Sequence, residues 1–219
     1  MSCLAQNTPI FQARWKHPTT SSLFVAATCY SPEPRRQIDV MTTVRPFRAR
    51  DLFAFNNVNM DYWTETYSNG FYLSYLAQWP DMTLTACAAH TDNLMGYVLG
   101  KAEGKEPRTD PKKRKKQEPT LHGHITAVTV APEYRRLGVA HMLMDFFEYC
   151  SEHVYRGYFV DLFVRPSNKK AVGMYEKRGY SVYRRVHAYY QGMPPNEPED
   201  GYGTYEKKQL ARRPSRKRT

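Results

Sequence analysis

The sequence has few cysteines, and their spacing excludes the roles that cysteines most often play. Only four occur among 219 residues, at Cys3, Cys29, Cys87 and Cys150. No pair has the C-x-x-C spacing of zinc ligands, and nothing resembles the dense framework of a disulfide-stabilised secreted domain. We therefore expect free thiols in a reducing compartment.

Long hydrophobic runs are missing as well. No apolar stretch approaches the ~18 residues that a membrane-spanning helix needs, so no membrane partner is expected. The hydrophobic fraction of 41% is still sufficient for a packed core. Tyrosine is abundant, with 17 residues, which makes a tyrosine-lined cleft plausible beside ordinary core packing.

Positive charge is abundant but unevenly placed. The formal net charge is +11. Five basic residues form the run Lys112–Lys116, and seven more lie in Lys207–Thr219, which contains no acid. The rest of the chain is therefore close to neutral. Such runs are usually solvated and disordered; docking on RNA and a nuclear address are the alternatives.

Composition divides the chain into a folded part and appendages. Residues 1–40 are rich in Ser, Thr, Pro and Gln and indicate a disordered leader, with Met41 as an alternative start. Because 1–32 lack acidic residues, a mitochondrial transit peptide is the less favoured alternative. We expect one domain at 41–208 with a basic insertion at about 104–119, followed by a basic disordered tail at 209–219.

Hydrophobic periodicity and turn signals predict a mixed α/β domain with a central sheet of about seven strands and about four flanking helices. The expected strands are Val44–Phe47, Thr83–Ala89, Leu94–Ala102, Ile125–Val130, Tyr158–Val164, Tyr180–Val186 and Tyr202–Lys208. The expected helices are Asp51–Asn59, Phe71–Gln78, Arg136 to about Glu152, and Ser167–Lys177, which Ser167 is expected to cap.

The turn RRLGVA, Arg135 to Ala140, stands between a predicted strand and a predicted helix. Free N–H groups at a helix start attract anions, and the helix dipole adds to the effect. Gly138 allows a ligand to approach the backbone closely. The spacing fits neither G-x-x-x-x-G-K-[ST] nor G-x-G-x-x-G. The turn therefore indicates a large anion other than a nucleoside triphosphate or a dinucleotide.

The turn and a second motif resemble the GCN5-related N-acetyltransferase (GNAT) superfamily. R-x-x-G-x-A after a strand resembles its acetyl-CoA signature, and Asn168-x-x-Ala171-x-x-x-Tyr175-x-x-x-Gly179-Tyr180 resembles its second hallmark. Over roughly Met41–Lys208, stretches such as FNNVNMDYWTETY, HGHITAVTVAPEYRRLGVA and FVDLFVRPSN resemble the catalytic subunits of N-terminal acetyltransferase B (NatB) complexes.

This resemblance implies the GNAT fold and the transfer of acetyl from acetyl-CoA, without a metal, to the α-amino group of nascent proteins. The implied N-termini are Met followed by Asp, Glu, Asn or Gln. The implied partners are a large helical-repeat auxiliary subunit and the ribosome, in the cytoplasm. The leader, the basic insertion and the tail lie outside the resemblance.

The resemblance also implies roles for residues around the cosubstrate. Backbone groups of Val128 and Val130 line the pantetheine arm, and Asn168 and Tyr175 lie near the thioester sulfur. Tyr175 is the candidate acid for the leaving thiolate; its alternative role is that of an aromatic at the edge of the core. The pyrophosphate is received by Arg135, Arg136, Leu137, Gly138, Val139 and Ala140.

Other residues are implied to meet the peptide. His124 and Thr126 are expected at substrate position two, or His124 relays the amine proton through water; recognition is favoured. His122 and His124 share strand spacing, but no third metal ligand is nearby. Glu65 is expected to hold the substrate backbone or amine. Tyr67, Tyr189 and Tyr190 are expected to clamp its first residues, with a strand-end aromatic ladder as the alternative for the last two.

The first two predicted helices carry more apolar residues than one sheet face needs, and some are expected to face the auxiliary subunit. These residues are Phe53, Phe55, Phe71, Tyr72 and Leu76. Two alternatives stay open at this point. One is an acetyltransferase of the same fold for other N-termini or for lysine, and the other is a non-catalytic scaffold that binds ribosomes or RNA.

Overall fold

A computed structural model of the protein describes residues 42–60, 62–105, 121–191 and 197–206. The predicted leader, most of the basic insertion and the basic tail lie outside these residues, so the predictions about them stay predictions. Within the described part of the chain, no helix combines the length and the hydropathy needed to cross a bilayer.

The described residues form seven strands and four α-helices, as predicted. The strands are β1 (Thr42–Pro46), β2 (Thr83–Ala88), β3 (Leu94–Glu103), β4 (His122–Val130), β5 (Val160–Val164), β6 (Ser181–Tyr190) and β7 (Glu199–Glu206). The helices are α1 (Asn56–Asn59), α2 (Asn69–Gln78), α3 (Val139–His153) and α4 (Lys169–Lys177). Short 3-10 turns precede α1, β2 and α3.

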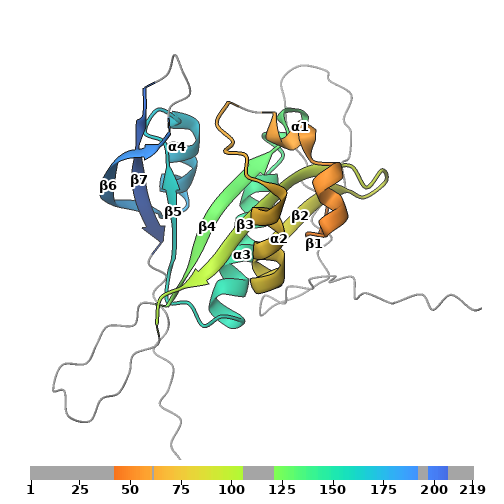
Figure 1. Ribbon diagram of the computed structural model, residues 1–219, viewed down its shortest axis with the longest axis horizontal. Helices are drawn as coiled ribbons and strands as arrows, with labels where there is room; N and C mark the ends of the chain where they lie inside the picture. Colours follow the sequence, from red (N-terminus) through yellow and green to blue (C-terminus); the bar gives the residue numbers. More distant parts are fainter. Residues whose placement is uncertain (1–41, 61, 106–120, 192–196, 207–219) are drawn as a thin grey trace, which may run out of the picture.

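The strands form one sheet in the order β1-β2-β3-β4-β5-β7-β6. All neighbours are antiparallel except β4 and β5, which run parallel. Those two strands pair only between Gly123–Ile125 and Val160–Leu162, and they then separate (Figure 1). The separation leaves the second half of β4 without a strand on that side.

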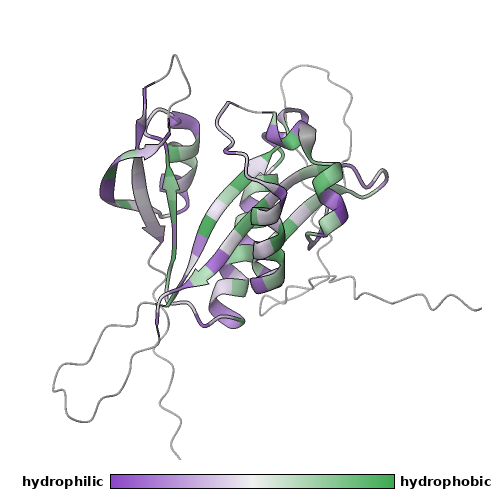
Figure 2. Cartoon of the chain, viewed as in Figure 1, coloured by the Kyte–Doolittle hydropathy of each residue, from purple (hydrophilic) through white to green (hydrophobic). Residues whose placement is uncertain are grey.

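Two hydrophobic cores hold the sheet, one on each face. Helices α3 and α4 pack on one face, where Leu143, Met144 and Phe147 are fully buried. Helices α1 and α2 cover the other face around Tyr72 and Tyr97. Strand β5 is mostly hydrophobic along its length, whereas β6 carries many hydrophilic residues (Figure 2), because β6 is an outer strand with little cover.

Several predicted boundaries were wrong for local reasons. The helix predicted at Asp51–Asn59 is a 3-10 turn, Ala49–Phe53, followed by the single turn α1. The Asp51 carboxylate caps the start of the 3-10 turn, two residues before the predicted start, by accepting hydrogen bonds from Arg45 and from the Arg48 backbone. Helix α4 is capped by Asn168 and not by Ser167, since the Asn168 side chain accepts from the Ala171 N–H.

The aromatic residues predicted to face a partner are divided between core and surface. Phe55 and Tyr72 are buried in the core under α1 and α2, and Phe71 and Leu76 pack against it. Only Phe53 is largely exposed, at 87%. Most of these apolar side chains therefore belong to a second core. Hydrophobic periodicity alone cannot tell side chains of a second core from side chains of a protein interface.

A buried ion pair fixes α4 against α3. Arg178, just after α4, donates to Asp145 (2.6 Å) and to Glu148 (2.9 Å), and the Tyr180 hydroxyl donates to the same Glu148 oxygen. Burial alone would lower the pKa of Arg178, but the hydrogen bonds to these carboxylates raise it above its ordinary value. The arginine thus stays charged between the two helices.

Glu148→Ala is expected to lower the free energy of unfolding by about 3 kcal/mol, because it removes the buried acceptor of the Tyr180 hydroxyl and leaves Arg178 with only the exposed carboxylate of Asp145. Asp145→Ala is the matched control: it removes the other carboxylate of the same arginine at a position 61% exposed, and it should cost less than about 1 kcal/mol. Urea denaturation of both variants measures the difference, and equal losses would contradict it.

Candidate active site

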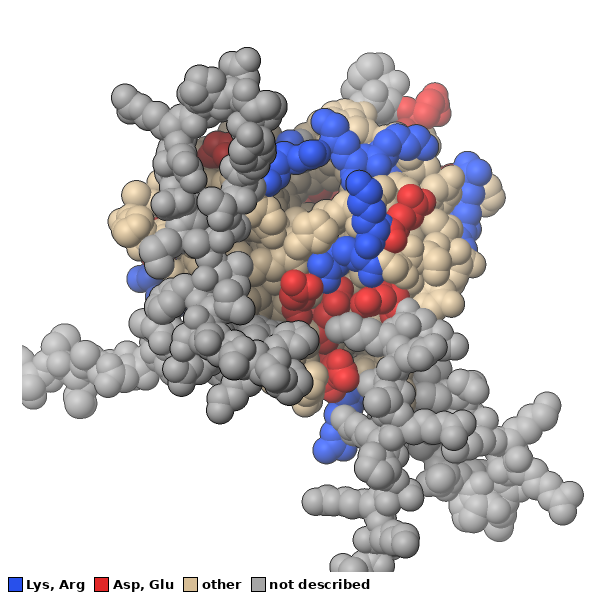
Figure 3. All heavy atoms as spheres, turned by 180° about the vertical axis from the view of Figure 1, so that it is seen from behind, with Lys and Arg blue, Asp and Glu red and all other residues tan. Residues whose placement is uncertain are grey.

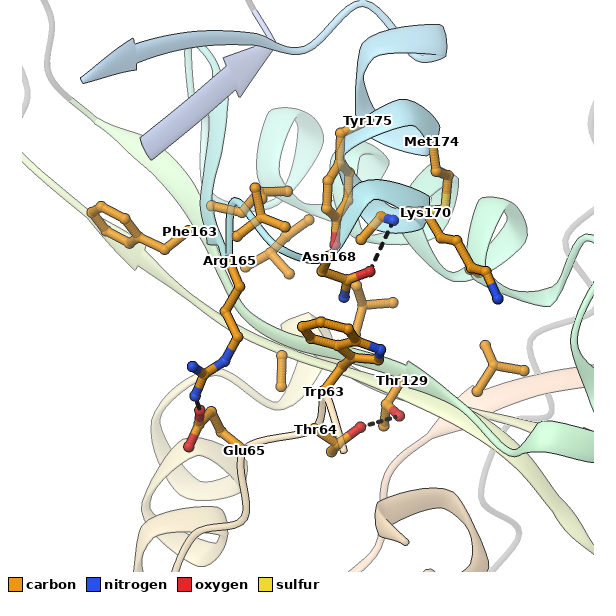
Figure 4. Close-up of a pocket in the computed structure, with 18 of the residues that line it drawn as sticks. Trp63, Thr64, Glu65, Thr129, Phe163, Arg165, Asn168, Lys170, Met174 and Tyr175 are labelled. Carbon is orange, nitrogen blue, oxygen red and sulfur yellow. Dashed lines mark hydrogen bonds and ion pairs between the residues drawn. The ribbon is translucent and has the colours of Figure 1, made fainter. Parts of the chain in front are cut away.

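A cleft of about 890 Å³ opens where β4 and β5 separate. Its floor is formed by Thr126–Val130 of β4, and one side is formed by Leu162–Arg165 at the end of β5. The starts of α3 and α4 and the loop before α2 complete the lining (Figure 4). The Thr64 and Thr129 hydroxyls, 2.9 Å apart, tie that loop to β4. The cleft is therefore bounded by elements from the whole length of the domain.

The turn RRLGVA has an unusual backbone. Arg136 has a positive φ of 67°, and Gly138, the N-cap of α3, has φ 80° and ψ 0°. Helix α3 consequently begins at Val139 and not at Arg136 as predicted. Left-handed residues alternating with ordinary ones direct successive N–H groups into one concavity, which binds anions. A strained non-glycine residue there also suits a functional site.

Most of the predicted cosubstrate residues do line the cleft. Val128 and Val130 lie on its β4 side, and the turn contributes Arg135, Arg136, Gly138, Val139 and Ala140. Leu137 is the exception, because its side chain packs against the core instead. Only its backbone is thus available to a ligand.

The charge of the cleft favours an anion. Its lining contains six Lys and Arg side chains and a single acidic one, Glu65. The six are Arg135, Arg136, Arg165, Lys169, Lys170 and Lys177. On the face opposite to that of Figure 1, Lys and Arg side chains form an arc beside a group of acidic ones (Figure 3). The six basic residues of the cleft lining thus match a polyanionic ligand.

Asn168 and Tyr175 meet on the α4 side of the cleft. Tyr175 points from α4 toward Asn168, and Trp63 lies across from them (Figure 4). The Asn168 side-chain oxygen is used by the helix cap at 3.1 Å. Within the described part of the chain, the Tyr175 hydroxyl has no hydrogen-bond partner. Burial raises the pKa of Tyr175, so its phenol stays protonated and can donate into the cleft.

Glu65 and Tyr190 meet through Arg165, a residue that the sequence analysis did not single out. The Arg165 guanidinium binds the Glu65 carboxylate and lies 4.2 Å from the centre of the Tyr190 ring. It also contacts Glu199 at 3.4 Å. Glu65 is therefore already paired with Arg165. If it also contacts the substrate amine, as expected, its carboxylate has to bind the amine and Arg165 together.

Tyr67 and Tyr189 line the cleft together with Glu65 and Tyr190. Tyr67 stacks on Phe71 and Tyr189 stacks on Phe163, both at 4.3 Å between ring centres. Burial raises the pKa of each tyrosine, so both stay neutral. Strand β6 continues through Tyr189 and Tyr190, beyond its predicted end at Val186.

A bulge in β6 directs these tyrosines. Ala188 has a positive φ of 50°, and the β6–β7 register shifts between Val186 and Tyr190. Asp200 holds the bulge by accepting from the Ala188 N–H at 2.9 Å. Bulges of this kind redirect side chains beside active sites.

His124 and Thr126 lie on β4 at the same end of the cleft. The Thr126 hydroxyl is 3.0 Å from the Tyr75 hydroxyl. The Nδ1 atom of His124 is 2.8 Å from Asp161 of β5. Sequence reasoning missed Asp161, although one acid inside the apolar run FVDLFV was a usable signal. Among the described residues, no group of three or more metal-ligating side chains is arranged to hold an ion.

Comparison with known proteins decides the family. A family model described as "Acetyltransferase (GNAT) family" matches residues 52–180. The chain belongs to the GNAT acetyltransferase family. It is 52% identical over 152 residues to N-alpha-acetyltransferase 20 of Dictyostelium discoideum, covering 69% of this chain and 80% of the relative. It is 41% identical over 168 residues to the NatB catalytic subunit NAT3 of Saccharomyces cerevisiae, covering 74% and 77%.

Solved structures agree. The crystal structure of Chaetomium thermophilum Naa20 with a bisubstrate analogue is 42% identical, with a TM-score of 0.65 over 75% of this chain and 86% of that one. A NatB complex bound to CoA and MES is 34% identical, with a TM-score of 0.62 over 75% and 97%. The predicted fold, the resemblance to NatB catalytic subunits and the prediction of an N-terminal acetyltransferase are thereby confirmed.

Gly138→Ala in this acetyltransferase is expected to raise the KM for acetyl-CoA about fivefold to tenfold, because the cleft turn combines backbone strain with close ligand approach. Gly138 lines the cleft, and a Cβ at this position would meet no protein atom within 4 Å. Steady-state kinetics at varied acetyl-CoA measures the effect.

Gly179→Ala is the matched control. Gly179 also has a positive φ, 91°, and open space around its Cβ position, but it follows α4 outside the cleft lining. Both variants should lose roughly 1 kcal/mol of stability, and only Gly138→Ala should change the KM. An unchanged KM in Gly138→Ala would argue against an anion site at the turn.

Proposed function

We propose that this enzyme transfers acetyl from acetyl-CoA to the α-amino group of nascent proteins that begin Met-Asp, Met-Glu, Met-Asn or Met-Gln. The observation that carries the proposal is the layout of the cleft along β4. His124 and Thr126 lie toward one end, and the anion-binding turn lies beyond Val130 at the other. Val130 lies six residue steps along the strand from His124, roughly 20 Å, which suits a peptide end and a cosubstrate arm meeting between them.

The proposed reaction needs little chemistry from the protein. An α-amine has a pKa near ~8, so a substantial share is neutral and nucleophilic. Its nitrogen attacks the thioester carbonyl directly in a ternary complex, the N–C bond forms and the C–S bond breaks. Backbone N–H groups on the free edge of β4 are candidates to stabilise the oxyanion. The amine proton leaves through water in the cleft.

Tyr175 is the proposed acid of the reaction. Its protonated phenol faces the cleft beside Asn168, where it can donate to the departing thiolate sulfur and afterwards recover a proton from solvent. Asn168 contributes its amide N–H groups at the same place, since its oxygen is held by the helix cap.

The proposed partner is the large auxiliary subunit that the resemblance implies, and two of the structural relatives are NatB acetyltransferase complexes. Large apolar side chains around α1 and α2 are exposed, which supports a protein interface there; they are Phe53, Met60, Tyr62 and Leu73. Cytoplasmic action at the ribosome, with the basic segments near RNA, remains part of the proposal and rests on the resemblance.

A peptide panel tests the specificity. With the auxiliary subunit present, Met-Asp, Met-Glu, Met-Asn and Met-Gln peptides should be acetylated at least about tenfold faster than peptides that begin with Ser, Ala or Met-Leu, or than lysine side chains. The reason is that polar groups arranged for a polar side chain are left unpaired by an apolar one. Equal rates across the panel would reject this specificity.

Tyr175→Phe tests the acid. It removes only the hydroxyl, so kcat should fall by roughly 10²-fold while acetyl-CoA affinity changes less than about threefold. Turnover on a Met-Asp peptide and calorimetric binding of acetyl-CoA give the two readings. A loss of affinity with kcat retained would instead assign Tyr175 to binding or packing.

A further inference from the structure

Asp161 is the only acidic residue of β5, and its side chain is almost completely buried beside the cleft. One carboxylate oxygen lies 2.8 Å from Nδ1 of His124. The other accepts a hydrogen bond from the Tyr183 hydroxyl at 3.2 Å. Both carboxylate oxygens of Asp161 therefore lie within hydrogen-bond distance of side-chain groups that can donate to them.

This contact determines which nitrogen of His124 carries a hydrogen. An ionised carboxylate only accepts hydrogen bonds, so Nδ1 of His124 must donate to it. The Nε2 atom then lies on the opposite edge of the ring. His124 lines the cleft, so Nε2 is the nitrogen left to meet a substrate.

The four proposed substrate classes share one feature at position two. Asp, Glu, Asn and Gln side chains all present an oxygen that accepts hydrogen bonds. A His124 ring that carries hydrogen on Nδ1 alone would offer only a lone pair to that oxygen. An Asp or Glu carboxylate only accepts hydrogen bonds, so Nε2 must carry a hydrogen too when one of them is bound, and the ring is then a cation; an Asn or Gln amide can instead donate to the Nε2 lone pair.

We propose that Asp161 is the positioning residue that orients His124 and compensates its charge, so that Nε2–H can bind the side-chain oxygen of substrate residue two. The inference rests on the proposed function, which it extends to a residue that does not touch the substrate. The buried negative charge makes the cationic ring tolerable, and a cationic ring favours a carboxylate over an amide.

Several charged or titratable side chains lie around the His124 ring, and Asp161 is the carboxylate nearest to it. Lys101 lies opposite His124 in the β3–β4 pairing, but it is bound to Glu103. His122 approaches the same Asp161 oxygen at 3.6 Å and Glu103 at 3.7 Å. Asp161 is thus the carboxylate in direct contact with the His124 ring.

Asp161→Asn separates charge from shape. An asparagine can still hydrogen-bond Nδ1 and hold the ring, but it carries no charge. The ratio of kcat/KM for a Met-Asp peptide to that for the matched Met-Asn peptide is expected to fall about tenfold, since a charge-assisted hydrogen bond becomes an ordinary one. The loss should appear in the KM for Met-Asp, with kcat within about twofold of wild type.

Tyr183→Phe is the matched control. It also removes one hydrogen bond at Asp161, but it keeps the charge, so the peptide ratio should stay within about twofold. Thermal melting and acetyl-CoA binding report whether each variant is folded. Equal losses on both peptides in Asp161→Asn, or no loss on either, would make Asp161 structural and overturn the proposal.

Nitrogen NMR of histidine-labelled wild-type enzyme gives a reading that needs no variant. The Nδ1 atom of His124 is expected to be protonated in the free enzyme, and both nitrogens when a Met-Asp peptide is bound. A free-enzyme ring protonated only on Nε2 would overturn the proposal. A wild-type enzyme that shows no preference on the peptide panel would refute the proposed specificity instead, so the two failures are distinguishable.

Discussion

The site depends on one constraint, which is that β4 and β5 pair at three positions and then part. Backbone groups on the freed edge of β4 lose a neighbouring strand while they stay inside the domain, and such groups require other partners. Cores on both faces of the sheet keep the strands in place as they diverge. The cleft is therefore a product of the packing, and a ligand with hydrogen-bonding groups can complete the interrupted sheet.

Charge in this protein acts through its location. The net charge of +11 comes from two basic runs outside the described residues, and the rest of the sequence is near neutral. Yet six Lys and Arg side chains line one cleft with a single acid. Since the field of a recessed site depends on the charges at its walls, the predicted preference for an anion rests on a small local excess of basic side chains that the overall composition conceals.

Sequence reasoning located the parts of the cleft that are local in the chain. RRLGVA was recognisable because strand, turn and helix start are contiguous, and the second motif correctly brought Asn168 and Tyr175 together at α4. It failed where contacts are long-range: Arg165 and Glu65 are 100 residues apart. The bulge at Ala188 depends on Asp200 in the neighbouring strand. The order of polar and apolar residues in β6 does not predict this bulge. Apolar side chains of a second core likewise resembled an interface until the face that buries them was known.

The two ends of the cleft present different kinds of groups to a ligand, backbone groups at one end and side chains at the other. The turn end relies on backbone N–H groups set by positive φ values at Arg136 and Gly138, and a backbone cradle tolerates changes in side chains. The end proposed for the peptide relies on side chains held by other side chains, Glu65 by Arg165 and His124 by Asp161. Because Asp161 is buried and Arg165 is half-buried, and both contacts depend on precise geometry, altering one partner changes what its neighbour can bind. Cosubstrate binding can thus persist across related enzymes while peptide preference changes through residues that never touch the peptide.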